Sequence, residues 1–252
     1  MALRIASLPA KVARRLLWMA EDLEVGRASR LRRRYPDCYE TIRTLSRLKP
    51  ADIQVVYDIG AREGNWVRTF HPFFPSLQEA VLFEPAQSCQ SQLGGLRLDG
   101  VSLRIEPVAL GKTPGRAILT GNGPSASLKK TTPLQERFFP GSSGNQCLKV
   151  SVDSIDRWIS SSYHRPPDLI KIDVQGAELE VLSGAEDTLS SCRWVVLEVS
   201  TLPLYEGQPL SGATFDWLET RGWRFVGSGY RWLSPAGQLL QFDALFTKEE
   251  VH

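Results

Sequence analysis

The chain has 252 residues, a length that accommodates one large α/β domain or two small ones. Its 42% hydrophobic and 23% charged residues are ordinary for a soluble globular protein. The formal net charge of +2 argues against a nucleic acid as partner of the whole molecule.

The cysteines give no sign of a disulfide framework or a zinc site. They are far apart in the sequence and include no Cys-x-x-Cys pair: Cys38, Cys89, Cys147 and Cys192. The sequence shows no apolar segment typical of a signal peptide, and no run approaches the roughly 18 apolar residues of a membrane span. We therefore expect a cytoplasmic protein with buried thiols.

Positive charge is concentrated in residues 1–49, which carry 12 Lys/Arg and 5 Asp/Glu, a net charge of +7 that leaves −5 for the remainder. Apolar residues recur there at helical spacing: Val12, Leu16, Met19 and Leu23. Such a helix could make weak peripheral contact with an acidic membrane or could pack on the domain. Acidic residues interrupt the basic face and favour packing: Glu21, Asp22 and Glu24. We treat 1–49 as a basic helical extension and 50–252 as the domain.

From Ile53 onward, strand-like and helical patterns alternate, which predicts a mostly parallel sheet with helices on both faces. The expected strands are 53–58, 80–83, 101–109, 168–174 and 194–199, followed by an antiparallel pair at 223–226 and 238–246. The expected helices are 65–70, 87–96, 176–189 and 210–221. Residues 112–150 are less regular, with strands expected at 116–120 and 148–152 and with loops that could cover a substrate.

The stretch Val55–Gly64 reads Val-Val-Tyr-Asp-Ile-Gly-Ala-Arg-Glu-Gly. It predicts the end of a buried strand, a glycine turn and a helix that begins near Asn65. Ligands of open α/β sheets bind at such turns, so a nucleotide-type site is favoured over an ordinary turn. Arg62 stands where the dinucleotide fingerprint requires glycine, and this favours a ligand with a ribose but no diphosphate. S-adenosylmethionine is such a ligand.

Three acidic residues each end a hydrophobic strand: Asp58, Glu84 and Asp173. Carboxylates at the ends of buried strands need partners. Glu84 follows Asp58 by 26 residues and suits the hydroxyl groups of a ribose, although it could also serve as a charge at the start of the next helix. Asp58 and Asp173 would favour the positive sulfonium of S-adenosylmethionine.

A specific resemblance lies in Asp168–Ala185, which reads Asp-Leu-Ile-Lys-Ile-Asp-Val-Gln-Gly-Ala-Glu-Leu-Glu-Val-Leu-Ser-Gly-Ala. This segment resembles the signature of the FkbM family of S-adenosylmethionine-dependent methyltransferases, in which glutamate usually stands where this chain has Gln175. Further similar segments follow the order of the family over about residues 53–200: Asp58–Ala61, Phe83–Pro85, Val108–Gly111, Ser151–Asp156 and Leu197–Ser200.

The resemblance implies a Rossmann-like class I methyltransferase fold, with a mostly parallel seven-stranded sheet whose last strand is antiparallel. It implies S-adenosylmethionine as donor, S-adenosylhomocysteine as product and a hydroxylated small-molecule acceptor such as a sugar or polyketide. By position, Asp58, Gly60 and Asn65 would face the methionine part of the donor, Glu84 the ribose, and Val108 and Ala109 the adenine. The remaining implied contacts are Ala61, Pro85, Asp153 and Asp173.

Methyl transfer is an in-line displacement that requires alignment of the acceptor and removal of its proton. The candidates for these tasks are Asp173, Glu178 and Glu198, with Asp173 first. Asp173 could equally cap the following helix, and Glu178 could simply favour its first turn. Lys171 is expected to pair with a neighbouring carboxylate. Asp173 and Glu198 could also hold a divalent cation, but two acids do not argue for a metal.

Two alternatives remain open on sequence grounds. The chain could be a non-enzymatic or inactive methyltransferase-fold binding protein, with Gln175 marking lost activity. It could also be a nicotinamide-dependent oxidoreductase, although Arg62 counts against that reading. The sequence also leaves open whether the chain forms a homo-oligomer.

Overall fold

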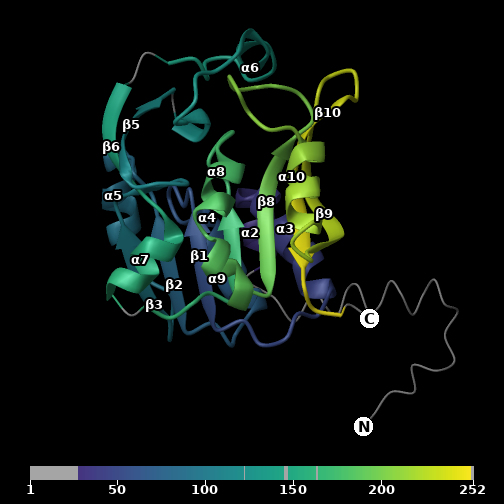
Figure 1. The fold of residues 1–252 in the computed structure, drawn as a ribbon. Helices are drawn as coiled ribbons and strands as arrows, with labels where there is room; N and C mark the ends of the chain where they lie inside the picture. Colours follow the sequence, from purple (N-terminus) through teal and green to yellow (C-terminus); the bar gives the residue numbers. More distant parts are fainter. Residues whose placement is uncertain (1–27, 122, 145–146, 163, 251–252) are drawn as a thin grey trace, which may run out of the picture.

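The computed structural model describes residues 28–121, 123–144, 147–162 and 164–250. Within them, seven strands form one sheet in the order β3-β2-β1-β7-β8-β10-β9 (Figure 1). Its strands are β1 (Val55–Ile59), β2 (Glu79–Phe83), β3 (Ser102–Glu106), β7 (Leu169–Ile172), β8 (Trp194–Ser200), β9 (Arg224–Leu233) and β10 (Leu239–Thr247). Neighbouring strands are parallel except that β10 runs antiparallel to both β8 and β9. The predicted fold class is confirmed.

The order of the strands reverses beside β1. The chain moves outward from β1 through β2 to β3 and then returns to β7 on the other side of β1. Ligands of open α/β sheets bind at the carboxyl ends of the strands that flank such a reversal. The topology therefore places the expected site above the ends of β1, β2 and β7.

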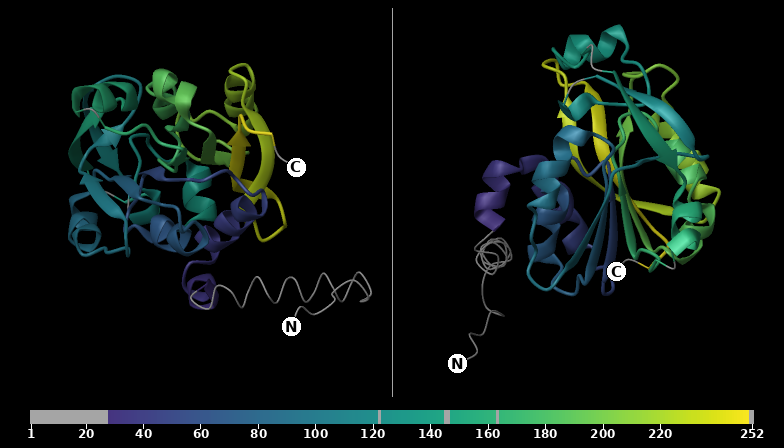
Figure 2. Two further views of the ribbon diagram at one scale, coloured as in Figure 1. Left: turned by 90° about the horizontal axis from the view of Figure 1, so that it is seen from below. Right: turned by 90° about the vertical axis from the view of Figure 1, so that its left-hand side faces the viewer.

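Helices cover both faces of the sheet (Figure 2). The helices are α2 (Ala28–Arg34), α3 (Pro36–Arg47), α4 (Asn65–Phe70), α5 (Gln87–Gly94), α6 (Pro133–Phe138), α7 (Ile155–Ser162), α8 (Glu178–Ser183), α9 (Glu186–Ser191) and α10 (Ser211–Glu219), with 3₁₀ turns η2 (His71–Phe73) and η3 (Gly123–Ser125). Side chains of α3, α4 and α5 pack on one face, and those of α7 to α10 pack on the other. Strands β1, β7 and β8 are buried at every position, as expected for strands covered on both sides.

A small second sheet lies beyond the carboxyl ends of the central strands, with α6 near it at the top of Figure 1. It consists of β4 (Ala109–Leu110), β6 (Cys147–Asp153) and β5 (Gly115–Thr120), in that order. The single strand predicted at 101–109 is therefore divided, because β3 ends at Glu106 and the chain then joins the second sheet as β4. Helix α6 lies in a segment for which the sequence predicted no helix.

The helix predicted at 176–189 is also divided, into α8 and α9. The break falls at Gly184, where a methyl group would lie 2.1 Å from the carbonyl oxygen of Gly111. Close packing of two backbones at this point permits only glycine and interrupts the helix.

Helix α3 packs on the core, with Ile42 and Leu45 fully buried. The predicted helix face of Val12, Leu16, Met19 and Leu23 lies outside the described residues. Across the residues that the structure describes, no helix combines the length and the apolar character needed to cross a membrane.

Candidate active site

A cavity of about 1250 Å³ opens at the carboxyl ends of β1, β2, β7 and β8. Its walls include residues of η3, α6, β5 and β6 from the segment above the sheet. Sites for one small molecule usually measure about 300–1,000 Å³. The volume therefore suits two molecules side by side, as a transfer reaction requires.

The turn from β1 into α4 forms the floor of this cavity. Gly60, Arg62 and Gly64 adopt left-handed backbone conformations, with φ of 75°, 51° and 73°. A methyl group on Gly60 would lie 1.9 Å from the carbonyl oxygen of Asp173, so glycine is required where the turn passes the end of β7. Gly60, Ala61 and Asn65 line the cavity.

Glu84 ends β2 and also lines the cavity. Its carboxylate accepts hydrogen bonds from the backbone N–H groups of Arg62 at 2.8 Å and Ala86 at 2.7 Å. Burial raises the pKa of Glu84, and the two N–H groups oppose that rise. Among the described residues, no lysine or arginine forms an ion pair with it. Each oxygen retains a lone pair, so the carboxylate can still accept hydrogen bonds from ligand hydroxyl groups.

Apolar side chains continue the lining beyond Glu84. Pro85, Val108 and Ala109 all line the cavity. Asp153 does not. It lies at the end of β6, accepts the N–H of Ser154 at 2.8 Å and pairs with Arg157 at 2.9 Å.

Asp58 lies beneath the cavity and is fully buried. The ammonium group of Lys171 lies 3.1 Å from its Oδ1 atom and 3.5 Å from Oδ2 of Asp173, so the predicted pairing of Lys171 with a carboxylate is confirmed. Burial raises the pKa of Asp58, and Lys171 opposes that rise. Burial lowers the pKa of Lys171, but Asp58 and Asp173 outweigh it, so the net shift is upward. Asp58 thus forms an ion pair with Lys171, and the same ammonium group pairs with Asp173.

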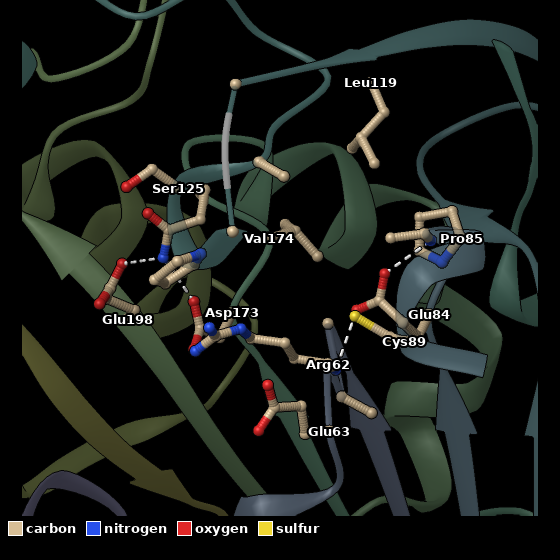
Figure 3. A pocket seen from close by; sticks show the side chains of 18 of the residues that line it. Arg62, Glu63, Glu84, Pro85, Cys89, Leu119, Ser125, Asp173, Val174 and Glu198 are labelled. Atoms are coloured by element: carbon tan, nitrogen blue, oxygen red, sulfur yellow. Dashed lines mark hydrogen bonds between the residues drawn. The ribbon is translucent and has the colours of Figure 1, made fainter. Parts of the chain in front are cut away.

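Asp173 and Glu198 face the cavity together, on the opposite side from Glu84 and Pro85 (Figure 3). The side-chain amide of Gln175 joins them: its nitrogen donates to Oδ1 of Asp173 at 2.7 Å and to Oε2 of Glu198 at 2.9 Å. Burial raises the pKa of Glu198, and the negative charge of Asp173 raises it further. The two carboxylates therefore form one unit.

Glu178, the third catalytic candidate, lies outside the cavity lining. Its carboxylate accepts the N–H of Gly176 at 3.0 and 3.1 Å and that of Val174 at 3.3 Å. Burial raises the pKa of Glu178 to about 7, although these hydrogen bonds oppose the rise. This geometry gives Glu178 the task of holding the loop that carries Asp173 and Gln175.

Several lining residues escaped the sequence-based prediction. They come from α3, the end of β9 and β10: Asp37, Cys38, Trp232 and Gln241. No local motif marks them, since only tertiary packing brings them to the cavity. The sequence did single out Gln175, because glutamate usually stands at this position in the family. That difference did not indicate that Gln175 hydrogen-bonds to two acids.

The thiols correct one expectation. Cys192 is buried, Cys38 and Cys89 are half-buried, and Cys147 is exposed; all four are free. The three that are not buried line the cavity, and two of them, Cys38 and Cys89, also pack against the core. Within the described part of the chain, no group of three or more His, Cys, Asp or Glu side chains is arranged to hold a metal ion.

The fold and the site together define a class I methyltransferase. The sheet has the expected single reversed strand, and the cavity lies at the reversal of strand order. The donor set fits S-adenosylmethionine, since a carboxylate ends β2, apolar residues follow, and the turn lacks the glycine that a diphosphate needs.

Comparison with known proteins identifies the family. A family described as "Methyltransferase FkbM domain" matches residues 58–225. The chain therefore belongs to the FkbM family and is an S-adenosylmethionine-dependent methyltransferase. It is 32% identical over 178 residues to 2-O-methyltransferase NoeI of Sinorhizobium fredii (strain NBRC 101917 / NGR234). The matched residues make up 65% of this chain and 70% of that protein.

Similarity to solved structures is more distant. Precorrin-6y C5,15-methyltransferase of Geobacter metallireducens GS-15 is 16% identical with a TM-score of 0.44, covering 82% of this chain and 86% of the other. Magnesium protoporphyrin IX methyltransferase of Synechocystis PCC 6803 is 10% identical with a TM-score of 0.44, covering 98% and 88%. The assignment of the fold rests on the strand order and not on these similarities.

Proposed function

We propose that this protein transfers the methyl group of S-adenosylmethionine to a hydroxyl oxygen of an uncharged small molecule such as a sugar or a polyketide. The observation that carries this proposal is the pair of carboxylates, Asp173 and Glu198, that faces the cavity opposite Glu84. The similarity to a 2-O-methyltransferase supports oxygen as the accepting atom.

The donor end of the cavity is formed by Gly60, Ala61, Asn65, Glu84, Pro85, Val108 and Ala109. Glu84 would accept hydrogen bonds from the ribose, and Val108 and Ala109 would contact the adenine. S-adenosylmethionine, when bound, supplies an activated methyl group on a positive sulfonium. The carboxylates of the site favour that positive charge.

The acceptor end is formed by Asp173, Gln175, Glu198, Trp232 and Gln241. Asp173 would orient the hydroxyl group, because its side chain is 36% exposed and points into the cavity. Glu198 would take up the proton, since its raised pKa makes it a stronger base than an ordinary carboxylate. Glu178 would hold the loop and would not contact the substrate.

Charge at this end selects against anionic acceptors. Asp37, Asp173 and Glu198 line it and outnumber the one arginine of the described lining, Arg62, while the charge of Lys171 is already engaged by Asp58 and Asp173. A phosphate or carboxylate on the acceptor would be repelled, whereas hydroxyl groups can donate hydrogen bonds to these acids. We therefore expect neutral polyhydroxylated compounds to react faster than their phosphorylated forms.

Isothermal titration tests the donor first, with S-adenosylmethionine, S-adenosylhomocysteine and NADH compared side by side. We expect binding of the first two and none of NADH; failure to bind S-adenosylmethionine would overturn the proposal. Methyl-labelled donor is then incubated with a panel of sugars and polyketides and with phosphorylated counterparts. Binding without transfer to any of them would indicate a binding protein that has lost its activity.

A further inference from the structure

Gln175 lies in the loop between β7 and α8 and adopts a left-handed backbone conformation with φ of 57°. Residues other than glycine rarely adopt this conformation, and it persists only where the surroundings impose it. The loop is held firmly on both sides. Ser127 donates its hydroxyl to the carbonyl oxygen of Gln175 at 2.6 Å, and Glu178 accepts the N–H groups of Val174 and Gly176. The strained backbone therefore places the Gln175 side chain at a defined position.

The hydrogen bonds of the side-chain amide fix which way it faces. Its nitrogen uses both protons, one for Asp173 and one for Glu198. Its oxygen accepts the hydroxyl of Tyr205 at 2.8 Å. The reversed amide would point its oxygen at two carboxylates and lose both bonds to them. The two carboxylates thus set the orientation. The fully buried Tyr205 donates to the amide oxygen and packs against Gly176, where a methyl group would lie 3.0 Å from its Cβ.

We infer that Gln175 is a positioning residue: its neutral amide holds the carboxylates of Asp173 and Glu198 side by side, facing the acceptor. The inference rests on the proposed function. It adds the amide of Gln175 as the group that keeps the two carboxylates in place. Asp173 and Glu198 would repel one another if nothing lay between them. The amide offers two N–H donors, carries no charge and does not titrate.

The charges around the pair explain why these donors matter. The ionisable groups around it come from β1, the β1–α4 turn, β7, β10, α3, α8 and the segment after β8: Asp58, Arg62, Lys171, Asp243, Asp37, Cys38, Glu178 and Tyr205. Among the described residues, Lys171 is the one cation that forms an ion pair within this cluster. Gln241 donates to Glu198 at 2.7 Å, and Gln175 is the donor that reaches both acids.

The test compares Gln175→Glu, Gln175→Met and Gln175→Gly by the pH profile of kcat and by donor affinity. Glutamate and methionine retain the side-chain length and the backbone strain, whereas glycine relieves the strain; all three remove the amide. We expect each to lower kcat at pH 7 by about 10- to 100-fold and to shift the acidic limb of the profile upward by about one pH unit. Donor affinity should stay within about twofold. Tyr205→Phe retains the ring and should give a smaller shift in the same direction.

Carbon-13 NMR titration of the carboxyl groups of Asp173 and Glu198 gives a readout that does not need turnover. In the full-length chain, Gln175→Met should raise the apparent titration midpoint of the pair. Asp173→Asn and Glu198→Gln assign the signals. An unchanged midpoint and an unchanged kcat profile would overturn the role of Gln175, even in an active enzyme. If the wild-type protein transfers no methyl group but Gln175→Met still raises the midpoint, the proposed function alone is refuted.

Discussion

Two turns that are close in sequence build most of the proposed donor end of the cavity, whereas the proposed acceptor end is assembled from segments between α3 and β10. Gly60, Ala61 and Asn65 lie in the β1–α4 turn, and Glu84 and Pro85 follow the neighbouring strand β2. The acceptor end needs the β7–α8 loop, β8, β9 and β10, with Asp37 of α3 beside them. The difference teaches that the proposed donor end depends on local turns, while the proposed acceptor end depends on the tertiary assembly.

The largest effect is expected where the two ends meet, at Gly60. Gly60→Ala would force a methyl group to within 1.9 Å of the Asp173 carbonyl oxygen in a left-handed turn. We expect a loss of at least about 3 kcal/mol in the free energy of unfolding and loss of donor binding. Urea denaturation and titration with S-adenosylmethionine measure both.

Gly237→Ala is the matched control, since its φ is 83° and nothing lies within 4 Å of the added methyl group. Its cost should be about 1 kcal/mol, with normal donor binding. Equal losses for the two variants would mean that backbone conformation alone, and not contact between the two ends, makes Gly60 necessary.

Asp173→Asn separates the acceptor end from the donor end. The amide can still hold an acceptor but cannot carry the negative charge, so kcat should fall by about 100-fold while donor affinity changes little. Single-turnover assays and titration give the two numbers. Glu186→Gln, an exposed acid on α9 outside the cavity lining, should leave both unchanged. A variant that retains full activity would remove Asp173 from the acceptor end.

Glu84→Ala tests the donor end. Loss of hydrogen bonds to a charged group should weaken donor binding by about 1–3 kcal/mol, with kcat at saturating donor largely retained. Glu106→Ala is the control, because Glu106 ends the neighbouring strand β3 and does not line the cavity. If both variants bind the donor like the wild type, Glu84 does not contact the ribose.

A smaller effect concerns the buried acids behind the acceptor end. Burial raises the pKa of Asp243 to about 7, although the hydroxyl of Thr41 donates a hydrogen bond to it. The folded protein therefore binds a proton that the unfolded chain releases between about pH 4 and pH 7. Stability should fall as the pH rises through that window. Asp243→Asn should raise the free energy of unfolding by about 1–2 kcal/mol at pH 8 and change it little at pH 4.

Urea denaturation between pH 4 and pH 8 gives this comparison. The exposed Asp216→Asn should follow the wild-type curve. If the free energy of unfolding of Asp243→Asn depends on pH in the same way as that of the wild type, the charge of Asp243 does not destabilise the folded state.

The sequence predicted features that depend on local segments and missed features that depend on tertiary assembly. The turn at Gly60, the acid at Glu84 and the alternation of strands and helices were predictable because each depends on residues adjacent in the chain. The bridge formed by Gln175 was not, because its partners Glu198 and Tyr205 approach it only when β8 pairs with β7 and the next loop folds back. Helix α6 was missed because its six residues are too few to show a helical period.

The matched family segment, 58–225, is shorter than the unit that folds. Thr41 of α3 hydrogen-bonds to Asp243 of β10 and to the backbone N–H of Tyr230 in β9, so the two ends of the chain are fastened to each other across the sheet. A protein shortened to the matched segment would lose α3 and β10. Strand β8, buried at every position in the intact protein, would then become an apolar edge open to pairing with other chains. Solubility, as well as catalysis, thus depends on residues beyond the recognisable family signature.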